Sequence, residues 1–268
     1  MPLPQPTFLV AHGVLGLANP APPDPGRDQR LIEAVRQEFP NVVNHQLPPP
    51  GMPVLAPHLL LASTSSQVAL SLAQADFEVR FYGDYLTDIG RGLEYVERKL
   101  TAVRSGLIAA DLQPSTIGLV ATFHFSFEEY KGASPAAYVQ RTLLRTEVPL
   151  EELQDALARV AAKVRDMYFV TLTASNFESR VLERPIMPGT TAIRIRPWEG
   201  RVNDTGIELT IDINNTLEGR TQSEDPVVTE GGIRAVTQML REIATTTGPG
   251  FVETGEVAVA SLAASSQP

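Results

Sequence analysis

The stretch IELTIDINN at residues 207–215 places two carboxylates and two carboxamides in one short apolar run. Strand alternation would turn its apolar side chains to one face and Glu208, Asp212 and Asn214 to the other. Asp212 and Asn214 would then be same-face neighbours, and hard cations such as Mg²⁺ and Ca²⁺ take such oxygen ligands. The pattern is compatible with a metal or acid–base site, and equally with the charged outer face of a sheet.

The segment TAIRIRPW at residues 191–198 alternates in the same way and favours the second interpretation. It turns isoleucines inward and Arg194 and Arg196 outward. Opposite charges on paired strands are an ordinary way to solvate a sheet and to set its register. We therefore predict that the two arginines pair with Glu208 and Asp212 across the sheet, and that these carboxylates hold no metal ion.

The histidines give no metal-site pattern. His12, His45, His58 and His124 are scattered, and no two have the spacing that places a pair of imidazoles on one helix face. Cysteine is absent, which removes thiolate ligands, cysteine nucleophiles and disulfides. His124 stands apart because it lies on the polar side of a phenylalanine-rich strand candidate. An ordinary hydrogen-bonded sheet histidine is the simpler interpretation; a ligand site on the polar sheet face, shared with the arginines and carboxylates above, is the alternative.

Charge limits the classes of partner. The chain has 22 Lys and Arg against 31 Asp and Glu, a formal net charge of -9, which disfavours a general attraction to nucleic acid or anionic lipid. Arg141 and Arg145, four residues apart in an expected helix, could hold a phosphate or a partner's carboxylate. Trp198 is the only tryptophan, and a tryptophan in a turn could anchor an interface. Nucleic-acid binding through these arginines, with Arg194 and Arg196, is the least favoured hypothesis.

Hydrophobic periodicity predicts an α+β protein with a mainly antiparallel sheet, covered on one face by long amphipathic helices. The strand candidates are residues 8–17, 58–64, 67–72, 77–83, 115–127, 167–174, 191–198 and 206–214. The strongest helix pattern covers residues 86–103, and Leu93, Val96 and Leu100 should lie in the core. Further helices are expected after Asp28 as a cap, from Ser134, over residues 150–164 and from near Thr229.

The chain is expected to form one domain over residues 1–257, followed by a flexible tail at 258–268. A proline-rich stretch at 45–57 interrupts the pattern and predicts an exposed extended arm. The order of elements suggests a pseudo-repeat of two halves. No signal peptide and no membrane-spanning segment is expected, so a cytoplasmic location is predicted.

Several short segments resemble an uncharacterised, sporadically distributed prokaryotic family of about this length. They are the apolar strand at 8–17, EFP at 38–40, a hairpin followed by a tyrosine before the long helix (Tyr82 or Tyr85), GL at 118–119, and ELTIDIN at 208–214. The resemblance implies a shared fold. It brings no catalytic residues, because that family has no settled activity.

These observations favour a non-catalytic prokaryotic interaction or assembly protein that needs no cofactor. Self-association or a protein partner would use the sheet edges, the proline-rich arm or the Trp198 turn, with Arg141 and Arg145 as further interface candidates. An enzyme or small-ligand-binding protein with its site on the polar sheet face is the main alternative.

Overall fold

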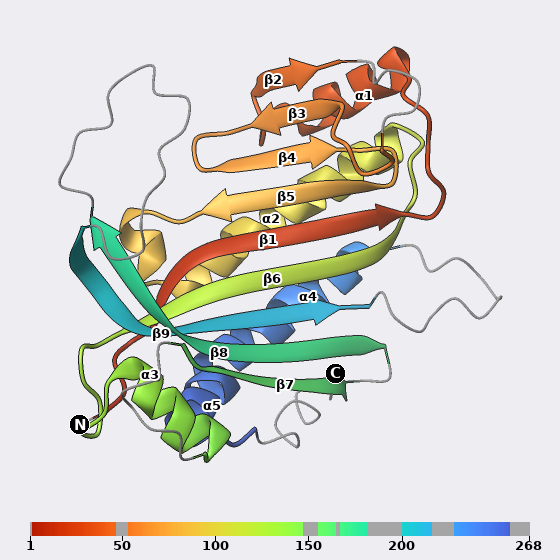
Figure 1. Cartoon of the computed structure of the whole chain (residues 1–268). Helices are drawn as coiled ribbons and strands as arrows, with labels where there is room; N and C mark the ends of the chain where they lie inside the picture. The colour runs from red at the N-terminus through yellow and green to blue at the C-terminus, as the bar shows by residue number, and fades with distance from the viewer. Residues whose placement is uncertain are drawn as a thin grey trace.

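Nine strands form one sheet in the order β2-β3-β4-β5-β1-β6-β9-β8-β7 in the computed structural model of this chain (Figure 1). The structure describes residues 2–46, 53–146, 155–164, 167–181, 200–215 and 228–257. Each neighbouring pair of strands is antiparallel. The predicted α+β class with a mainly antiparallel sheet is thereby confirmed.

The elements have the following bounds. The strands are β1 Thr7–Leu17, β2 Asn41–His45, β3 Leu59–Ala62, β4 Ser66–Leu70, β5 Gln74–Arg80, β6 Pro114–Ser126, β7 Leu157–Val164, β8 Tyr168–Val181 and β9 Arg201–Asn214. The helices are α1 Pro25–Val35, α2 Ile89–Ala109, α3 Pro135–Tyr138, α4 Glu230–Glu242 and α5 Gly248–Thr254, with shorter helical segments η1 Gly83–Leu86, η2 Val139–Leu144 and η4 Ile243–Thr247.

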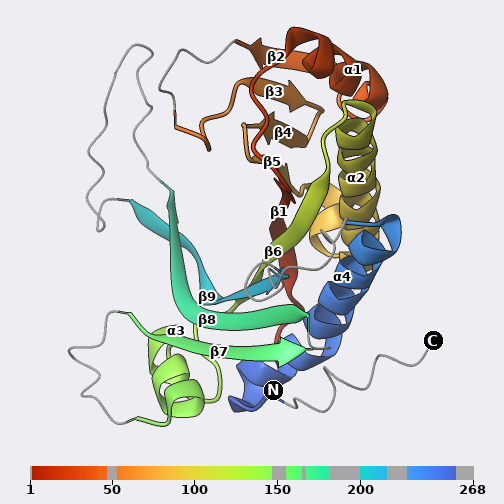
Figure 2. The same cartoon turned by 90° about the vertical axis from the view of Figure 1, so that its right-hand side faces the viewer.

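The core lies between the sheet and the helices. Helices α1, α2 and α4 run along one side of the sheet (Figure 2). Helix α2 contacts β1, β5 and β6, and α4 contacts β6 and β9. The predicted core residues Leu93, Val96 and Leu100 are all buried, because their spacing of three and four residues puts them on the helix face that meets the sheet.

Strand alternation separates the two faces of the sheet as predicted. In β9 the apolar residues from Ile207 to Ile213 are buried and the polar residues between them are half-buried on the other face. In β6, Phe123 and Phe125 are buried while His124 lies on the polar side. The central strands therefore have one face against the core and one polar face.

The helix predicted over residues 150–164 is wrong. Leu157–Val164 is strand β7, which pairs with β8 from Leu157 opposite Ser175 to Val164 opposite Tyr168. Leu157 is 53% exposed while Ala158 is buried, the reverse of what a helix with Leu157 inward requires. Pairing with β8 supplies a hydrogen-bond ladder that local helix propensity does not anticipate. Residues 147–154 lie outside the described residues.

The helix caps were partly predicted. Ser134 caps α3 and Thr229 caps α4 through their side-chain oxygens, as expected. Helix α1 is instead capped by Asp24, whose carboxylate accepts from the backbone N–H of Gly26. The predicted cap, Asp28, is one turn inside the helix and buried.

The predicted arm at 45–57 is only partly described. His45 ends β2, residues 47–52 lie outside the described residues, and Val54 and Leu55 are 48% and 60% exposed. The backbone N–H of Leu72 donates to the carbonyl of Val54. The predicted tail at 258–268 also lies outside the described residues. Among the described helices, none has the length and apolar character to cross a membrane.

Candidate functional site

Among the described residues, the polar sheet face carries one contact between predicted site residues, that of His124 with Glu208. His124 in β6 lies directly opposite Glu208 in β9, and His124 Nε2 is 3.1 Å from Glu208 Oε2. The imidazole also stacks on the ring of Phe177 in β8, with centroids 3.7 Å apart and planes 19° from parallel. Neighbouring strands thus hold the imidazole between an aromatic face and a carboxylate.

Asp212 is not part of this contact. Its cross-strand neighbours are Val120 and Thr171, and its Oδ1 accepts a hydrogen bond of 3.1 Å from Asn214 Nδ2. Strand β9 has Thr210 between Asp212 and Glu208 on the polar face, so the two carboxylates belong to separate rows of the sheet.

The remaining predicted residues have different outcomes. Arg194, Arg196 and Trp198 lie outside the described residues, and both edges of β9 between Ile207 and Ile213 are taken by β6 and β8. Arg141 and Arg145 are exposed at the end of η2, where Arg145 Nη2 is 3.0 Å from Glu256 Oε1. Within the described ranges no three His, Asp or Glu side chains are grouped so that they could hold a metal ion.

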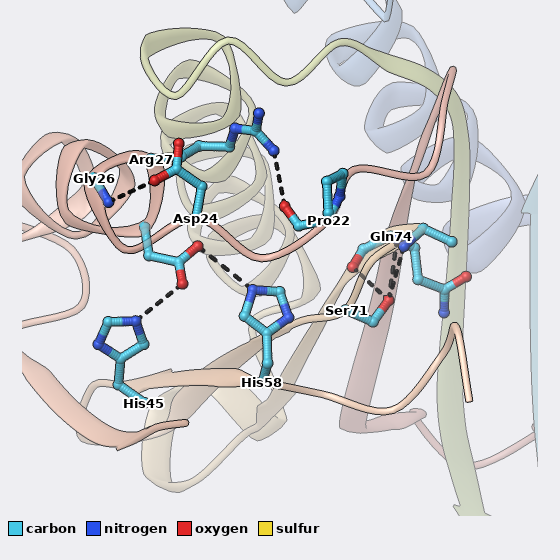
Figure 3. A network of polar contacts seen from close by, with 10 residues as sticks. Pro22, Asp24, Gly26, Arg27, His45, His58, Ser71 and Gln74 are labelled. Atoms are coloured by element: carbon cyan, nitrogen blue, oxygen red, sulfur yellow. Dashed lines mark hydrogen bonds and ion pairs between the residues drawn. The ribbon is translucent and has the colours of Figure 1, made fainter. Parts of the chain in front are cut away.

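A second cluster, which the sequence did not predict, surrounds Asp28 in α1. Asp28 Oδ2 lies 2.9 Å from His45 Nε2, and Asp28 Oδ1 lies 3.4 Å from His58 Nε2. Figure 3 labels the two histidines and draws each joined to this carboxylate by a dashed line. His45 is the last residue of β2. His58 directly precedes β3, and the backbone N–H of His58 donates to the carbonyl of Leu70. One carboxylate therefore joins helix α1 to two strands at the end of the sheet.

The electrostatics favour an ionised Asp28. Burial raises the pKa of this carboxyl, but the hydrogen bonds from His58 and His45 outweigh burial and hold its pKa below the ordinary value. A carboxylate only accepts, so the Nε2 atoms of both histidines must carry the hydrogens. The side chains of Asp28 and His58 are 2% and 3% exposed, and His58 Nδ1 is buried with no hydrogen-bond partner among the described residues.

At His58 this arrangement suits a structural clamp better than a proton-transfer site, whereas the His45 side chain is 33% exposed. An imidazole oriented by a carboxylate can act as a base through its second nitrogen. The second nitrogen of His58 is closed off from solvent, so no ligand reaches it in this structure. The cluster instead fixes β2 and the start of β3 against α1.

The distances along the chain explain why this cluster was missed. His45 and His58 are 17 and 30 residues from Asp28, and no local spacing rule joins residues so far apart. The one available signal was that Asp28 shares its helix face with Leu31 and Val35. A carboxylate on an apolar face needs a buried partner, and a histidine is such a partner.

Comparisons with protein-family models and with curated proteins found no match for this chain. The functional proposals therefore rest on the side chains themselves.

Proposed function

We propose that this chain is a non-catalytic interaction or assembly protein that associates through the edge strand β2. The observation that carries this proposal is the exposure of β2. Among the described strands it ends the sheet, with β3 as its one neighbour, and all five of its residues are exposed, including Val42 at 48% and Val43 at 59%. An edge strand offers unpaired backbone donors and acceptors to another strand.

The opposite edge supports the choice of β2. Strand β7 carries Arg159 and Lys163, both exposed, and charged side chains on an edge discourage pairing with another chain. Strand β2, with the sequence NVVNH, has no Asp, Glu, Lys or Arg. Its one titratable residue, His45, is held by Asp28. Strand β2 is therefore the edge with less protection against pairing with another chain.

The partner that this strand fits is a second copy of the chain. In a two-fold antiparallel ladder a residue lies opposite its own copy, and the uncharged run Asn41-Val42-Val43-Asn44 would bring no like charges together across such a ladder. A two-fold interface requires such self-complementarity. The pairing of β2 with β3 is irregular between Val42 and Asn44, which limits the length of a regular ladder and favours a weak, reversible association.

We also propose that the sheet is a pseudo-repeat of two halves and that each half supplies one edge strand of the sheet. In the first half, β1 pairs with β5, the last strand before α2; in the second, β6 pairs with β9, the last strand before α4. The run Leu-Val-Ala occurs at 9–11 and 119–121, and Ala11 lies opposite Ala121 where β1 meets β6. In this interpretation the helices of both halves cover the same sheet face, and β2 and β7 are the outer ends of the two halves.

Sedimentation velocity over a concentration series tests the proposal. The wild type should self-associate, and Val43→Lys should remain monomeric because it places a charge on the pairing edge. Val181→Lys is the control, since Val181 in β8 is 48% exposed and lies far from β2 in the strand order. A wild type that stays monomeric throughout, or dissociation by Val181→Lys alone, would overturn the assignment to β2.

The stacked contact at His124 favours a second candidate, a small-ligand-binding function on the polar sheet face. An imidazole between Phe177 and Glu208 could present hydrogen bonds to a ligand lying on the sheet. A thermal-shift screen of metabolites tests it. A ligand that stabilises wild type and not His124→Ala would support this function, whereas equal stabilisation of both would place the ligand elsewhere.

A further inference from the structure

A polar cavity of about 300 Å³ lies where the β3–β4 turn meets the end of β5. Hydroxyl groups of the turn, residues 63–66, line one side. Gln67, Glu78 and Arg80 line it from β4 and β5, and Tyr82 follows β5. Its volume is at the lower end of the range of small-molecule sites, about 300 to 1,000 Å³.

The charged side chains of the cavity are held in place by one another. Glu78 Oε2 accepts from Gln67 Nε2 at 3.0 Å, and Glu78 Oε1 accepts from Arg80 Nε at 3.0 Å. These bonds lower the pKa of Glu78, with the Arg80 hydrogen bond as the largest cause. An amide, a carboxylate and a guanidinium thus form an ordered array whose two charges cancel.

The hydroxyl side of the cavity is fixed from behind by α2. The Tyr95 hydroxyl lies 3.4 Å from Ser63 Oγ, 3.3 Å from Ser65 Oγ and 3.0 Å from Ser66 Oγ. Ser63 Oγ and Ser66 Oγ are themselves 2.7 Å apart. These contacts restrain the turn, so a ligand would meet hydroxyl groups that are already positioned and lose less free energy to ordering them.

We infer that this cavity binds a neutral polyhydroxylated molecule, a sugar or sugar-like polyol. Serine and threonine hydroxyls donate and accept, and Glu78 and Gln67 supply further acceptors and donors. Tyr82 is 66% exposed, and its aromatic ring offers an apolar surface for the C–H face of a sugar ring. Because the negative charge of Glu78 offsets the positive charge of Arg80, the cavity favours neither an anion nor a cation over a neutral ligand.

Saturation-transfer difference NMR on the full chain tests this site, with glucose, galactose and mannose as neutral probes. Gluconate, glucosamine and inorganic phosphate serve as charged probes. We expect saturation transfer from the protein to at least one neutral sugar. We also expect Tyr82→Ala and Gln67→Ala to bind that sugar about tenfold more weakly than wild type. Both positions are exposed, so the variants should keep the wild-type melting temperature.

The matched control is Gln29→Ala, an exposed glutamine on α1 outside the cavity, which should bind as wild type does. No saturation of any neutral sugar would overturn the assignment. So would a sugar signal that persists in both cavity variants, or a preference for gluconate, glucosamine or phosphate. None of these outcomes depends on the self-association of β2, because the cavity and β2 involve different residues.

Discussion

The His45 Nε2 atom, at the end of edge strand β2, lies 2.9 Å from Oδ2 of Asp28 in helix α1. This contact matters because β2 has few other ties to the protein. All five of its residues are exposed, and β3 is its one neighbour among the strands that the structure describes. The buried carboxylate therefore controls how firmly the proposed binding edge is held.

Asp28→Asn should destabilise the protein by about 1.5 to 3 kcal/mol, the range for hydrogen bonds to a charged group. Asparagine keeps the size of the side chain but turns one acceptor oxygen into a donor that faces a histidine N–H. Urea unfolding measures the change. Asp24→Asn is the control on the same helix, and it should have little effect because asparagine caps helices as well as aspartate does. Equal losses in both variants would contradict the clamp.

The clamp should also weaken in acid. Because the folded-state pKa of Asp28 lies below its ordinary value of 3.8, the ionised carboxylate stabilises the fold at pH values above that ordinary value. Its contribution is lost as pH falls through the folded-state pKa. The stability difference between wild type and Asp28→Asn should therefore shrink as the pH is lowered below about 4. Urea unfolding of both proteins over a pH series measures it, and a difference that grows on acidification would be inconsistent with a lowered pKa.

Leu100→Ala should cost about 2 to 5 kcal/mol, since it leaves a cavity where α2 meets the sheet. Leu100 is 1% exposed, and its side chain lies close to Gly13 of β1. Ile108→Ala is the control on the same helix, because Ile108 is 43% exposed and should lose at most about half a kcal/mol. Chemical unfolding of both variants gives the comparison. Similar small losses would show that α2 does not pack as the structure has it.

Elements with strict hydrophobic periodicity could be predicted from the sequence, whereas contacts between residues far apart along the chain could not. The spacing of Leu93, Val96 and Leu100 predicted a buried helix face, and alternation predicted both faces of β9. The apolar residues at 157–164 fit a helix as well as a strand, and only pairing with β8 decides between them. The Asp28 cluster depends on tertiary contacts with two histidines, which no local pattern encodes.

Asp212→Asn should barely change stability and should not alter any response to divalent cations. Asp212 is half-buried on the polar face and accepts from Asn214, a bond that the side-chain oxygen of asparagine can also accept. Partly exposed polar contacts of this kind contribute about 0 to 1 kcal/mol. The measurement is the melting temperature of wild type and Asp212→Asn with and without Mg²⁺, Mn²⁺ and Ca²⁺. Glu208→Gln provides the comparison on the same strand, and it should have a similarly small effect because glutamine can still hydrogen-bond His124. If one cation raises the melting temperature of wild type by several degrees and leaves that of Asp212→Asn unchanged, Asp212 belongs to an acidic metal site and not to a charged sheet face.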